Sequence, residues 1–555
     1  MKQKTKILLI NPKGHDVYSN EWREISFLTN NSGLLLNAAL PTLVALTPRD
    51  KFEISIVDEY IEEIDFNQEC DIVGITGFPP QYSRGHEIAI EFKKRGKLIV
   101  CGGSSVSCSM DRWEKYADVL FIGEGEITWP QFLKDYEMGS YKNKYYQDKD
   151  FDIANSPIPD YSAYSEENLS KYYGGVVLVC RGCPNNCEFC DAIEYSGRRL
   201  RYKPVENIIN ELEALYQKGI KRVFLAADNL TGNRSKAREI LKGIRDWNQK
   251  KESAAIFATN LDIDIANHED ILELAAEAGL NRAFVGLETP NPESLSEAEK
   301  NVNLKNDVHQ CVKAFHIHGI QIMSGSIVGF DSDDLSIFQM QFDYFTELGI
   351  PGVSIYSMQA RDMTRLKDRI VSDGRYIDDE IGGFGRPLQK DTPNPNSINV
   401  TTILYKKMSI AQLQQGGYWL LWKLYDFDNY IDRLELFIKD FQESPKLDKI
   451  KFLKFVPEKQ EKYMVQQLHD YAINKAPEDE KKAILRGLDI LERTSVPNKS
   501  MIVVRAILQV LNIRRQLKKQ VDKIETIEYP KMNGDRIENR VPQNFEEYKK
   551  ELFTI

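Results

Sequence analysis

The residues best suited to chemistry in this 555-residue chain are four cysteines crowded into residues 180–190. They form the run Cys180-Arg-Gly-Cys183-Pro-Asn-Asn-Cys187-Glu-Phe-Cys190, and only eight cysteines occur in the whole chain. Disulfide scaffolds distribute their cysteines along the chain, whereas crowded thiols favour metal or redox chemistry. We therefore expect a metal centre in this loop.

Three metal sites could use such a loop. A structural zinc site normally separates its two C-x2-C pairs by about a dozen residues or more, and the pairs here are too close. A ferredoxin-type cluster uses C-x2-C-x2-C with a distant fourth cysteine, which does not match. The third interpretation takes Cys183, Cys187 and Cys190 as ligands of a 4Fe–4S cluster whose fourth iron stays open. Cys180 is then a buried thiol at a strand end or a spare ligand.

The first 150 residues alternate apolar runs with helical patterns. Continuous runs rich in β-branched residues are typical of parallel strands that are covered on both faces. The runs span residues 6–11, 53–58, 71–76, 97–101 and 118–122. They predict a doubly wound, Rossmann-like α/β domain over residues 1–150, with a ligand crevice outside the carboxyl ends of its strands. Small and polar residues follow each run, as expected for loops that bind a ligand. Ordinary turns between strands and helices use the same residue types, so the spacing alone does not decide between a ligand crevice and simple turns.

A second series of predicted strands positions the cysteine loop. The strands span residues 176–180, 222–228, 254–260, 282–288, 321–329 and 352–359, with amphipathic helices between them. Six consecutive βα units predict a partial TIM-type barrel over residues 151–370, whose active site lies at the carboxyl ends of the strands. The cysteines follow the first of these strands.

Helical periodicity without strand signals continues from about residue 371 to residue 555 and predicts an all-α C-terminal region. Segments 412–424, 483–491 and 501–519 show it most clearly. The last segment has an apolar face with Ile502 and Ile507 and a basic end with Arg514 and Arg515. This pattern fits a weak contact with an anionic membrane surface, and it fits equally a packed helix with a solvated basic end.

The composition limits the other classes of function. Hydrophobic residues make up 42%, charged residues 28% and aromatic residues 10%, as in soluble globular proteins. Lys and Arg number 73 against 83 for Asp and Glu, and a net charge of −10 argues against nucleic acid as a partner. With no long apolar run and no cleavable signal at the start, we expect a cytoplasmic protein.

The spacing Cys183-x3-Cys187-x2-Cys190, placed after the first strand of a six-unit barrel, resembles the radical S-adenosylmethionine (SAM) superfamily. The resemblance implies that SAM chelates the open iron through its amino and carboxylate groups. It also implies that an electron from the cluster cleaves SAM to a 5′-deoxyadenosyl radical. An external electron donor such as flavodoxin or ferredoxin is implied as well.

The resemblance also implies SAM-binding residues. Phe189 matches the aromatic residue near the adenine, and the glycine-bearing run 325–330 resembles the strand along the adenosine. The polar residues at the other strand ends would bind the methionine and ribose groups, although each has a simpler interpretation as a cap or turn residue. The predicted SAM-binding residues are Phe189, Asp228, Asn229, Thr259, Glu288, Gly325, Gly329 and Gln359.

A doubly wound domain before such a barrel resembles the cobalamin-binding radical SAM enzymes. Three segments are similar to the branch that contains the hopanoid methylases, namely Ala226-Ala-Asp-Asn-Leu-Thr-Gly-Asn233, residues 190–199 and residues 417–425. The glycine-containing loops of the first domain would let the corrin approach the backbone closely. The predicted cobalamin-binding residues are Thr76, Gly77, Phe78, Gln81, Tyr82, Gly102, Gly103, Ser104, Gly123, Glu124, Gly125 and Glu126.

The lower face of the cobalt is not expected to have a histidine ligand. No D-x-H-x-x-G motif occurs in residues 1–150, where the only histidines are His15 and His86. The same branch usually covers this face without ligating it, and Phe78, Gln81 and Tyr82 are the candidates here.

Two segments depart from the family's pattern near the predicted pocket. Relatives usually have two aspartates before the asparagine of the second strand, where this chain has Ala227-Asp228. After the sixth strand, the usual Pro-Gly-Thr is replaced by Arg361-Asp362-Met363-Thr364. These departures concern the substrate and the reaction outcome, and they leave the cluster ligands intact.

The resemblance implies a methyltransferase that acts on an unactivated carbon of a lipid or natural-product intermediate, through a 5′-deoxyadenosyl radical and methylcobalamin. One alternative with the same cofactors is radical rearrangement or cyclisation without methyl transfer. An alternative of another class is a non-catalytic redox sensor that binds cobalamin and an iron–sulfur cluster. No individual catalytic residue is predicted.

Overall fold

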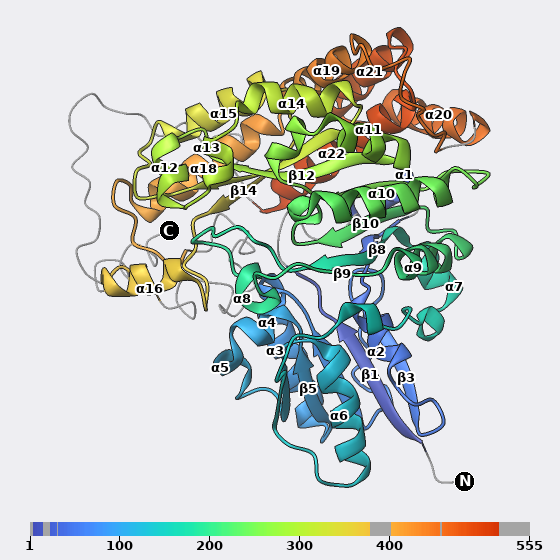
Figure 1. Ribbon diagram of the computed structural model, residues 1–555, viewed down its shortest axis with the longest axis vertical. Coiled ribbons are helices and arrows are strands. Elements are labelled where there is room, and N and C mark those ends of the chain that lie inside the picture. The colour runs from blue at the N-terminus through green and yellow to red at the C-terminus, as the bar shows by residue number, and fades with distance from the viewer. Residues whose placement is uncertain (1–3, 15–22, 30, 378–400, 456–457, 521–555) are drawn as a thin grey trace.

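Two parallel sheets and a helical C-terminal region make up the chain (Figure 1). The computed structural model describes residues 4–14, 23–29, 31–377, 401–455 and 458–520. The predicted fold class is therefore confirmed for the described residues. Residues 378–400 and 521–555 of the predicted helical region, and His15, lie outside them.

The first sheet is parallel throughout, in the order β3-β1-β4-β5-β6-β7. Its strands are β1 (Thr5–Asn11), β3 (Phe52–Asp58), β4 (Ile72–Thr76), β5 (Leu98–Gly102), β6 (Val119–Ile122) and β7 (Lys144–Tyr146). One face packs against α3 (Tyr82–Lys94), α4 (Ser104–Cys108) and α5 (Met110–Trp113). The other face packs against α2 (Ala39–Ala45) and α6 (Gly125–Glu137), which bury Leu40, Trp129 and Phe132. Helices on both faces confirm the doubly wound arrangement.

The strand order reverses between β1 and β4, because β3 lies on the far side of β1. At such a switch point the loops leave the sheet in opposite directions and open a crevice at the carboxyl ends of the strands. The loops after Asn11 and Thr76 flank this point. The sheet topology therefore determines where a ligand of the first domain would bind.

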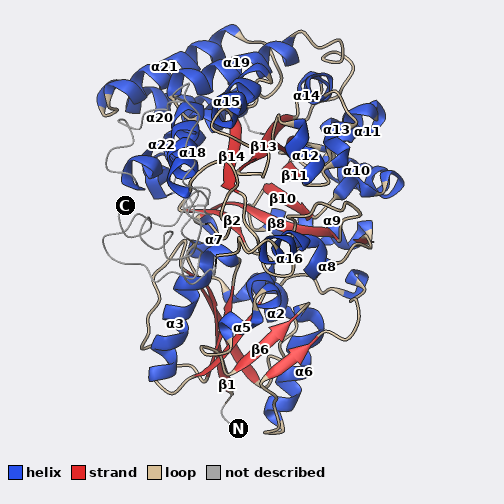
Figure 2. Cartoon of the chain, turned by 90° about the vertical axis from the view of Figure 1, so that its left-hand side faces the viewer, coloured by secondary structure: helices blue, strands red, loops and turns tan. Residues whose placement is uncertain are grey.

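The second sheet forms the half-barrel, in the order β14-β13-β12-β11-β10-β8-β2, with β9 antiparallel to β8 (Figure 2). Its strands are β2 (Gly33–Leu36), β8 (Tyr172–Arg181), β9 (Arg201–Tyr202), β10 (Arg222–Ala227), β11 (Ile256–Asn260), β12 (Leu280–Glu288), β13 (Gln321–Val328) and β14 (Gly352–Ser357). All six predicted barrel strands are present. The short β2 was not predicted, and it joins this sheet by pairing Leu35 with Gly174.

Amphipathic helices cover the outside of the half-barrel. They are α9 (Val205–Gln217), α10 (Arg234–Asn248), α11 (Glu269–Ala278), α14 (Val308–Ile317) and α15 (Ile337–Glu347). The remaining short helices before residue 377 are α1 (Ser26–Thr29), α7 (Glu166–Ser170), α8 (Ala192–Ser196), α12 (Pro292–Glu297), α13 (Asn301–Leu304) and α16 (Arg365–Ser372). In α9, the apolar residues Ile208, Leu212 and Leu215 lie on one face of the helix and are buried. Gly279 ends α11 with a φ of 101°, and this left-handed cap returns the chain to β12.

Five helices form the described C-terminal region: α18 (Ile410–Leu424), α19 (Phe427–Gln442), α20 (Glu458–Asn474), α21 (Glu478–Arg493) and α22 (Lys499–Gln520). The apolar face of α22 is buried in the core, including Ile502 and Ile507. At its basic end, Arg514 stacks on Trp422 and Arg515 pairs with Glu480. The described part of this helix is therefore a packed helix and leaves no apolar face for a membrane. No described helix is long and apolar enough to cross one.

Candidate functional site

The cysteine loop connects β8 to α8 at the carboxyl end of the half-barrel. Cys187 is buried, Cys183 and Cys190 are partly buried, and all three are free thiols. Burial raises the pKa of each thiol, that of Cys190 to about 12, and the charge of Cys187 adds to the shift at Cys190. Neighbouring buried thiols without a cation favour the protonated state, and a bound metal would reverse this preference. The donor set therefore fits an iron–sulfur cluster.

Cys180 has a different environment from the other three cysteines of the loop. It is 1% exposed, and its thiol donates to the carbonyl of Asn229 at 3.6 Å. Burial raises its pKa to about 12. The structure thus places Cys180 as a buried thiol at the end of β8.

Backbone and ion-pair contacts hold the cysteine loop against the barrel. The backbone N–H of Glu188 donates to the carbonyl of Ala298 at 3.1 Å, and its own carbonyl accepts from Leu366 at 3.2 Å. Arg369 on α16 donates to both carboxylate oxygens of Glu188 at 2.8 Å. The segment between Cys187 and Cys190 is therefore fixed from two sides.

The predicted SAM-binding residues of the second barrel strand lie beside the cysteine loop. The carboxylate of Asp228 accepts from the backbone N–H of Gly182 at 2.7 Å, and burial raises its pKa. The side-chain amide of Asn229 approaches the sulfur of Cys183 at 3.8 Å and donates to Asp262 at 2.6 Å. Both residues therefore connect the strand end to the loop that carries the thiols.

Glu288 lies at the end of β12 with a φ of 63°, which is unusual for a residue with a side chain. Its carboxylate is 3.3 Å from the ammonium of Lys300. Burial acts to lower the pKa of Lys300, but Glu288 and Cys187 raise it above its ordinary value. A strained carboxylate paired with a buried cation near Cys187 is suited to the amino acid end of SAM.

The other predicted SAM-binding residues lie at the strand ends but contact different partners. A Cβ at Gly325 would meet the ring of Phe284 at 3.2 Å and the carboxylate of Glu288 at 3.5 Å, so both side chains lie close to the backbone here. Thr259 is fully buried and its hydroxyl donates to the carbonyl of Leu225, so the side chain links the neighbouring strands β11 and β10. A Cβ at Gly329 would meet Leu413 and Tyr405 within 2.7 Å. Phe189 packs against the core, and Gln359 is buried at 7% exposure.

A crevice of about 820 Å³ lies between the first sheet and the half-barrel. Every predicted cobalamin-binding residue lines it except Tyr82, which is 3% exposed and donates to the carbonyl of Ser105. Phe78 is 62% exposed at this crevice. None of the lining residues is a histidine, and His86 is stacked on Tyr116 with its pKa lowered by burial to about 4.

Gly103 allows two loops at the carboxyl ends of β4 and β5 to pack closely together. Its φ is 101°, and a Cβ there would lie 2.8 Å from the hydroxyl of Thr76 and 3.2 Å from the carbonyl of Gly77. Only glycine fits this position without moving the neighbouring loop. Gly77 and Gly103 both line the crevice, so the backbone of the two packed loops forms part of its wall.

Charged residues connect the two walls of the crevice. Glu124 accepts from Arg181 and Arg201 at 2.8 Å each, and Glu126 accepts from Arg181 at 2.9 Å. Burial acts to raise the pKa of Glu124, but the two arginines hold it below its ordinary value. Both glutamates thus line the crevice as predicted, with arginines of the barrel as their partners.

Several lining residues lie outside the motifs of the sequence analysis. They include residues 34, 35, 37–40, 42 and 43 around β2 and α2, together with Tyr60, Lys203 and Glu211. The run Gly33-Leu-Leu-Leu36 is the one strand-like signal that could have revealed the first group. Lys300 and Asp262, beside the cysteines, also have no local motif.

The segment that departs from the family's Pro-Gly-Thr pattern connects the first domain to the barrel. Asp362 accepts from the hydroxyl of Ser109 at 2.5 Å and from Arg112 at 3.1 Å. Its neighbour Arg361 pairs with Asp191 at 3.0 Å, next to Cys190. These residues therefore have a structural role at the boundary between the two sheets.

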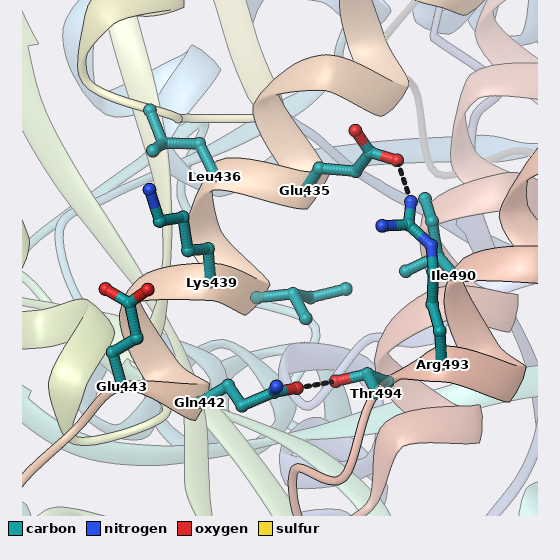
Figure 3. A pocket seen from close by; sticks show the side chains of 9 residues that line it. Glu435, Leu436, Lys439, Gln442, Glu443, Ile490, Arg493 and Thr494 are labelled. Atoms are coloured by element: carbon teal, nitrogen blue, oxygen red, sulfur yellow. Dashed lines mark hydrogen bonds and ion pairs between the residues drawn. The ribbon is translucent and has the colours of Figure 1, made fainter.

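A second hollow, of about 460 Å³, lies between α19 and α21 (Figure 3). Arg493 pairs with Glu435 across it, and the hydroxyl of Thr494 donates to Gln442 at 2.9 Å. These four polar side chains are thus paired with one another, and the hollow is built from the C-terminal helices alone. The crevice beside the cysteine loop is the better candidate site.

Comparison with known proteins agrees with this geometry. Residues 177–339 match the model of the radical SAM superfamily. The chain is 28% identical to an uncharacterized methyltransferase of Synechocystis sp., covering 74% of this chain and 75% of the relative. It is 30% identical to the hopanoid C-2 methylase of Rhodopseudomonas palustris, covering 64% and 66%.

Two solved structures share the fold. The methyltransferase TsrM from Kitasatospora setae, with cobalamin and a 4Fe–4S cluster bound, aligns with a TM-score of 0.54 at 15% identity, covering 93% of this chain and 100% of that one. The cobalamin-dependent enzyme OxsB aligns with a TM-score of 0.52 at 15% identity, covering 100% and 84%.

A parallel half-barrel with three thiols after its first strand, joined to a doubly wound domain across a crevice, defines a radical SAM enzyme with a second cofactor-binding domain. The chain belongs to the radical SAM superfamily, and it shares the fold of cobalamin-dependent members. The family predicted from the cysteine spacing and the first domain is therefore confirmed. The individual roles of the SAM-binding and cobalamin-binding residues stay predictions.

Proposed function

We propose that the protein is a cobalamin-dependent radical SAM methyltransferase that acts on an unactivated carbon. The observation that carries the proposal is the crevice itself, because its walls come from the glycine loops of the first sheet and from the strand ends beside the cysteines. A cofactor in this crevice and SAM at the cysteine loop would be neighbours. The proposal agrees with the methyltransferases to which the chain is similar.

The three thiols of Cys183, Cys187 and Cys190 would hold the cluster and leave one iron for SAM. Lys300 and Glu288 offer a cation and a carboxylate to the two charged groups of the methionine end. When bound, the cluster and SAM supply a 5′-deoxyadenosyl radical, and cobalamin supplies a methyl group. The protein's part is to position these groups and to keep water away from them.

The glycine loops would hold the corrin through backbone contacts. Gly77, Gly103 and Gly123 line the crevice, and the rim residues Glu124 and Arg181 offer charged partners to the amide side chains of cobalamin. With no histidine among the lining residues, the exposed ring of Phe78 is the best candidate to cover the lower face.

The substrate is a small molecule or a lipid. Relatives include the hopanoid C-2 methylase, a bacteriochlorophyllide d methyltransferase of Chlorobaculum tepidum, and TsrM, which has been solved with tryptophan. We further propose an electron donor of the flavodoxin or ferredoxin class and a cytoplasmic location, since thiolate-bound clusters need a reducing compartment.

Product analysis tests this function. Anaerobically reconstituted protein receives a reductant, SAM with a deuterated methyl group, and extracts of small molecules and lipids. Methyl transfer predicts S-adenosylhomocysteine, 5′-deoxyadenosine and a deuterated product formed together. Formation of 5′-deoxyadenosine with an unlabelled rearranged product would replace the proposal by rearrangement or cyclisation, and absence of SAM cleavage would favour a sensor.

A further inference from the structure

Helix α22 crosses the strand starts of the half-barrel, at the end opposite the cysteine loop. Its residues Arg505 and Gln509 contact side chains at the beginning of β12 and β13. Three arginines gather here, namely Arg222 at the start of β10, Arg282 near the start of β12, and Arg505. We call Arg222, Arg282 and Arg505 the strand-start arginine cluster.

All hydrogen-bond partners of the cluster are neutral amides. Arg282 donates to Gln321 at 3.0 Å and to Gln509 at 2.9 Å. Arg505 donates to Asn281 at 3.3 Å and, more weakly, to the same oxygen of Gln321 at 3.5 Å. One amide oxygen therefore serves two guanidinium groups, and it carries no negative charge to balance them.

The third arginine has an aromatic partner. The guanidinium of Arg222 lies 4.4 Å from the ring centre of Tyr173. Among the described residues, no Asp or Glu forms an ion pair with any of the three arginines. Near the crevice, by contrast, Arg181 and Arg201 both pair with Glu124. Arg505 is buried, and Arg222 and Arg282 are half-buried. Buried charge without a counter-charge is strongly unfavourable, so the cluster would be stabilised by a negatively charged partner.

Unused hydrogen-bond donors indicate what that component is. The Nε of Arg505, the Nε2 of Gln321 and the hydroxyl of Tyr430 are buried without a partner among the described residues. These side chains are 6%, 2% and 0% exposed. The Nε of Arg505 and the Nε2 of Gln321 can only donate. Tyr430 lies close enough to Arg282 and Arg505 to act on the pKa of both. An acceptor that carries negative charge would satisfy both the donors and the arginines.

We propose that the strand-start arginine cluster binds a small inorganic anion, a halide or an oxyanion such as phosphate, which fastens α22 to the half-barrel. This site lies at the opposite end of the barrel from the cysteine loop and is independent of the proposed reaction. The anion is a structural counter-ion that stabilises the folded state by mass action.

The variant Gln321→Glu tests the proposal by building the counter-charge into the chain. Thermal unfolding of the holoprotein is followed anaerobically in chloride, bromide, phosphate or sulfate, against gluconate at the same ionic strength. The wild type should be stabilised saturably by at least one small anion, with the unfolding constant falling on the order of tenfold at ten times its Kd. Gln321→Glu should be more stable than the wild type in gluconate and insensitive to the anion.

Arg505→Gln should lose the anion response, whereas Arg493→Gln, a surface variant with the same change of charge, should keep it. Crystals soaked in bromide give the direct view, with anomalous density expected within hydrogen-bond distance of Arg505 Nε. The proposal is overturned if wild-type stability is independent of the anion at constant ionic strength. It is also overturned if Gln321→Glu retains the full response, or if bromide leaves the cluster empty.

Discussion

The cysteine loop and the glycine loops that face it across the crevice are built in opposite ways. The cysteine loop is local: three ligands lie within residues 183–190, and their spacing alone indicates a cluster. The glycine loops come from three strand ends around residues 77, 103 and 123, brought together by the sheet order. One site is therefore encoded by spacing and the other by topology, and they should fail separately when mutated.

The largest expected effect is that of Cys187→Ala. Removing the central, buried ligand should abolish the cluster absorbance and reduce SAM cleavage to background, because two thiolates do not complete the site. Cys180→Ala is the matched control, since Cys180 donates to a backbone carbonyl and should be dispensable for the cluster. Cluster retention by Cys187→Ala after anaerobic reconstitution would contradict the assignment.

Gly103→Val should impair the glycine loops and leave the cysteine loop unaffected. The new side chain would overlap Thr76 and the carbonyl of Gly77 at a φ of 101°, which strains the loop by about 1 to 3 kcal/mol. Cobalamin affinity should fall at least about tenfold, while the cluster and cleavage of SAM to 5′-deoxyadenosine remain. A corrin band that survives gel filtration unchanged would refute this role for Gly103.

Gly96→Val provides the control for backbone strain. Gly96 has a φ of 71°, and nothing lies within 4 Å of its added Cβ. It should therefore carry a similar strain and keep cobalamin.

Glu124→Gln should weaken the connection between the regions. The substitution removes the charge that pairs with Arg181 and Arg201, and we expect a loss of about 2 to 4 kcal/mol in the free energy of unfolding at neutral pH. Because the folded-state pKa of Glu124 is depressed, its contribution is present above its ordinary value of 4.5 and is lost as pH falls through the folded value.

Denaturant unfolding of the wild type and Glu124→Gln at several pH values checks this prediction. The difference between them should be constant near neutral pH and narrow below about pH 4.5. A difference that grows on acidification would show that the charge of Glu124 does not stabilise the fold.

Asp362→Asn should have the smallest effect. It weakens the bonds from Ser109 and Arg112 at the boundary between the sheets and should cost about 1 kcal/mol in the free energy of unfolding. The cluster and corrin bands should both be kept. Denaturant unfolding measures the loss of stability, and absorbance measures the two cofactor bands. Loss of either band would mean that the contacts of Asp362 position a cofactor.

The parts of the fold predicted from the sequence are those with local signals. The apolar runs located eleven of the fourteen described strands to within a few residues, all except β2, β7 and β9, and the cysteine spacing located the loop. β2 was missed because Gly33–Leu36 is short and its partner β8 lies far along the chain. Lys300 was missed because no local motif marks it, and its ion pair with Glu288 exists only after folding.

For two predictions, the sequence pattern indicated a role that differs from the surroundings of the residue in the folded chain. Tyr82 follows the glycine loop in sequence, but it is the first residue of α3 and is directed toward Ser105 beneath the crevice. The basic end of α22 resembled a membrane-facing end, but Arg515 is paired with Glu480 from another helix. A single segment does not reveal such partners.

Simultaneous retention of both cofactors tests most directly whether this chain holds a cluster at the cysteine loop and a corrin in the crevice. The protein is reconstituted anaerobically with iron, sulfide and hydroxocobalamin, passed through gel filtration, and examined by absorbance and by iron and cobalt analysis. We expect a 4Fe–4S cluster and a corrin to be retained together, with the cluster lost in Cys187→Ala and the corrin lost in Gly103→Val. A protein that keeps its cluster but retains no corrin would contradict this expectation.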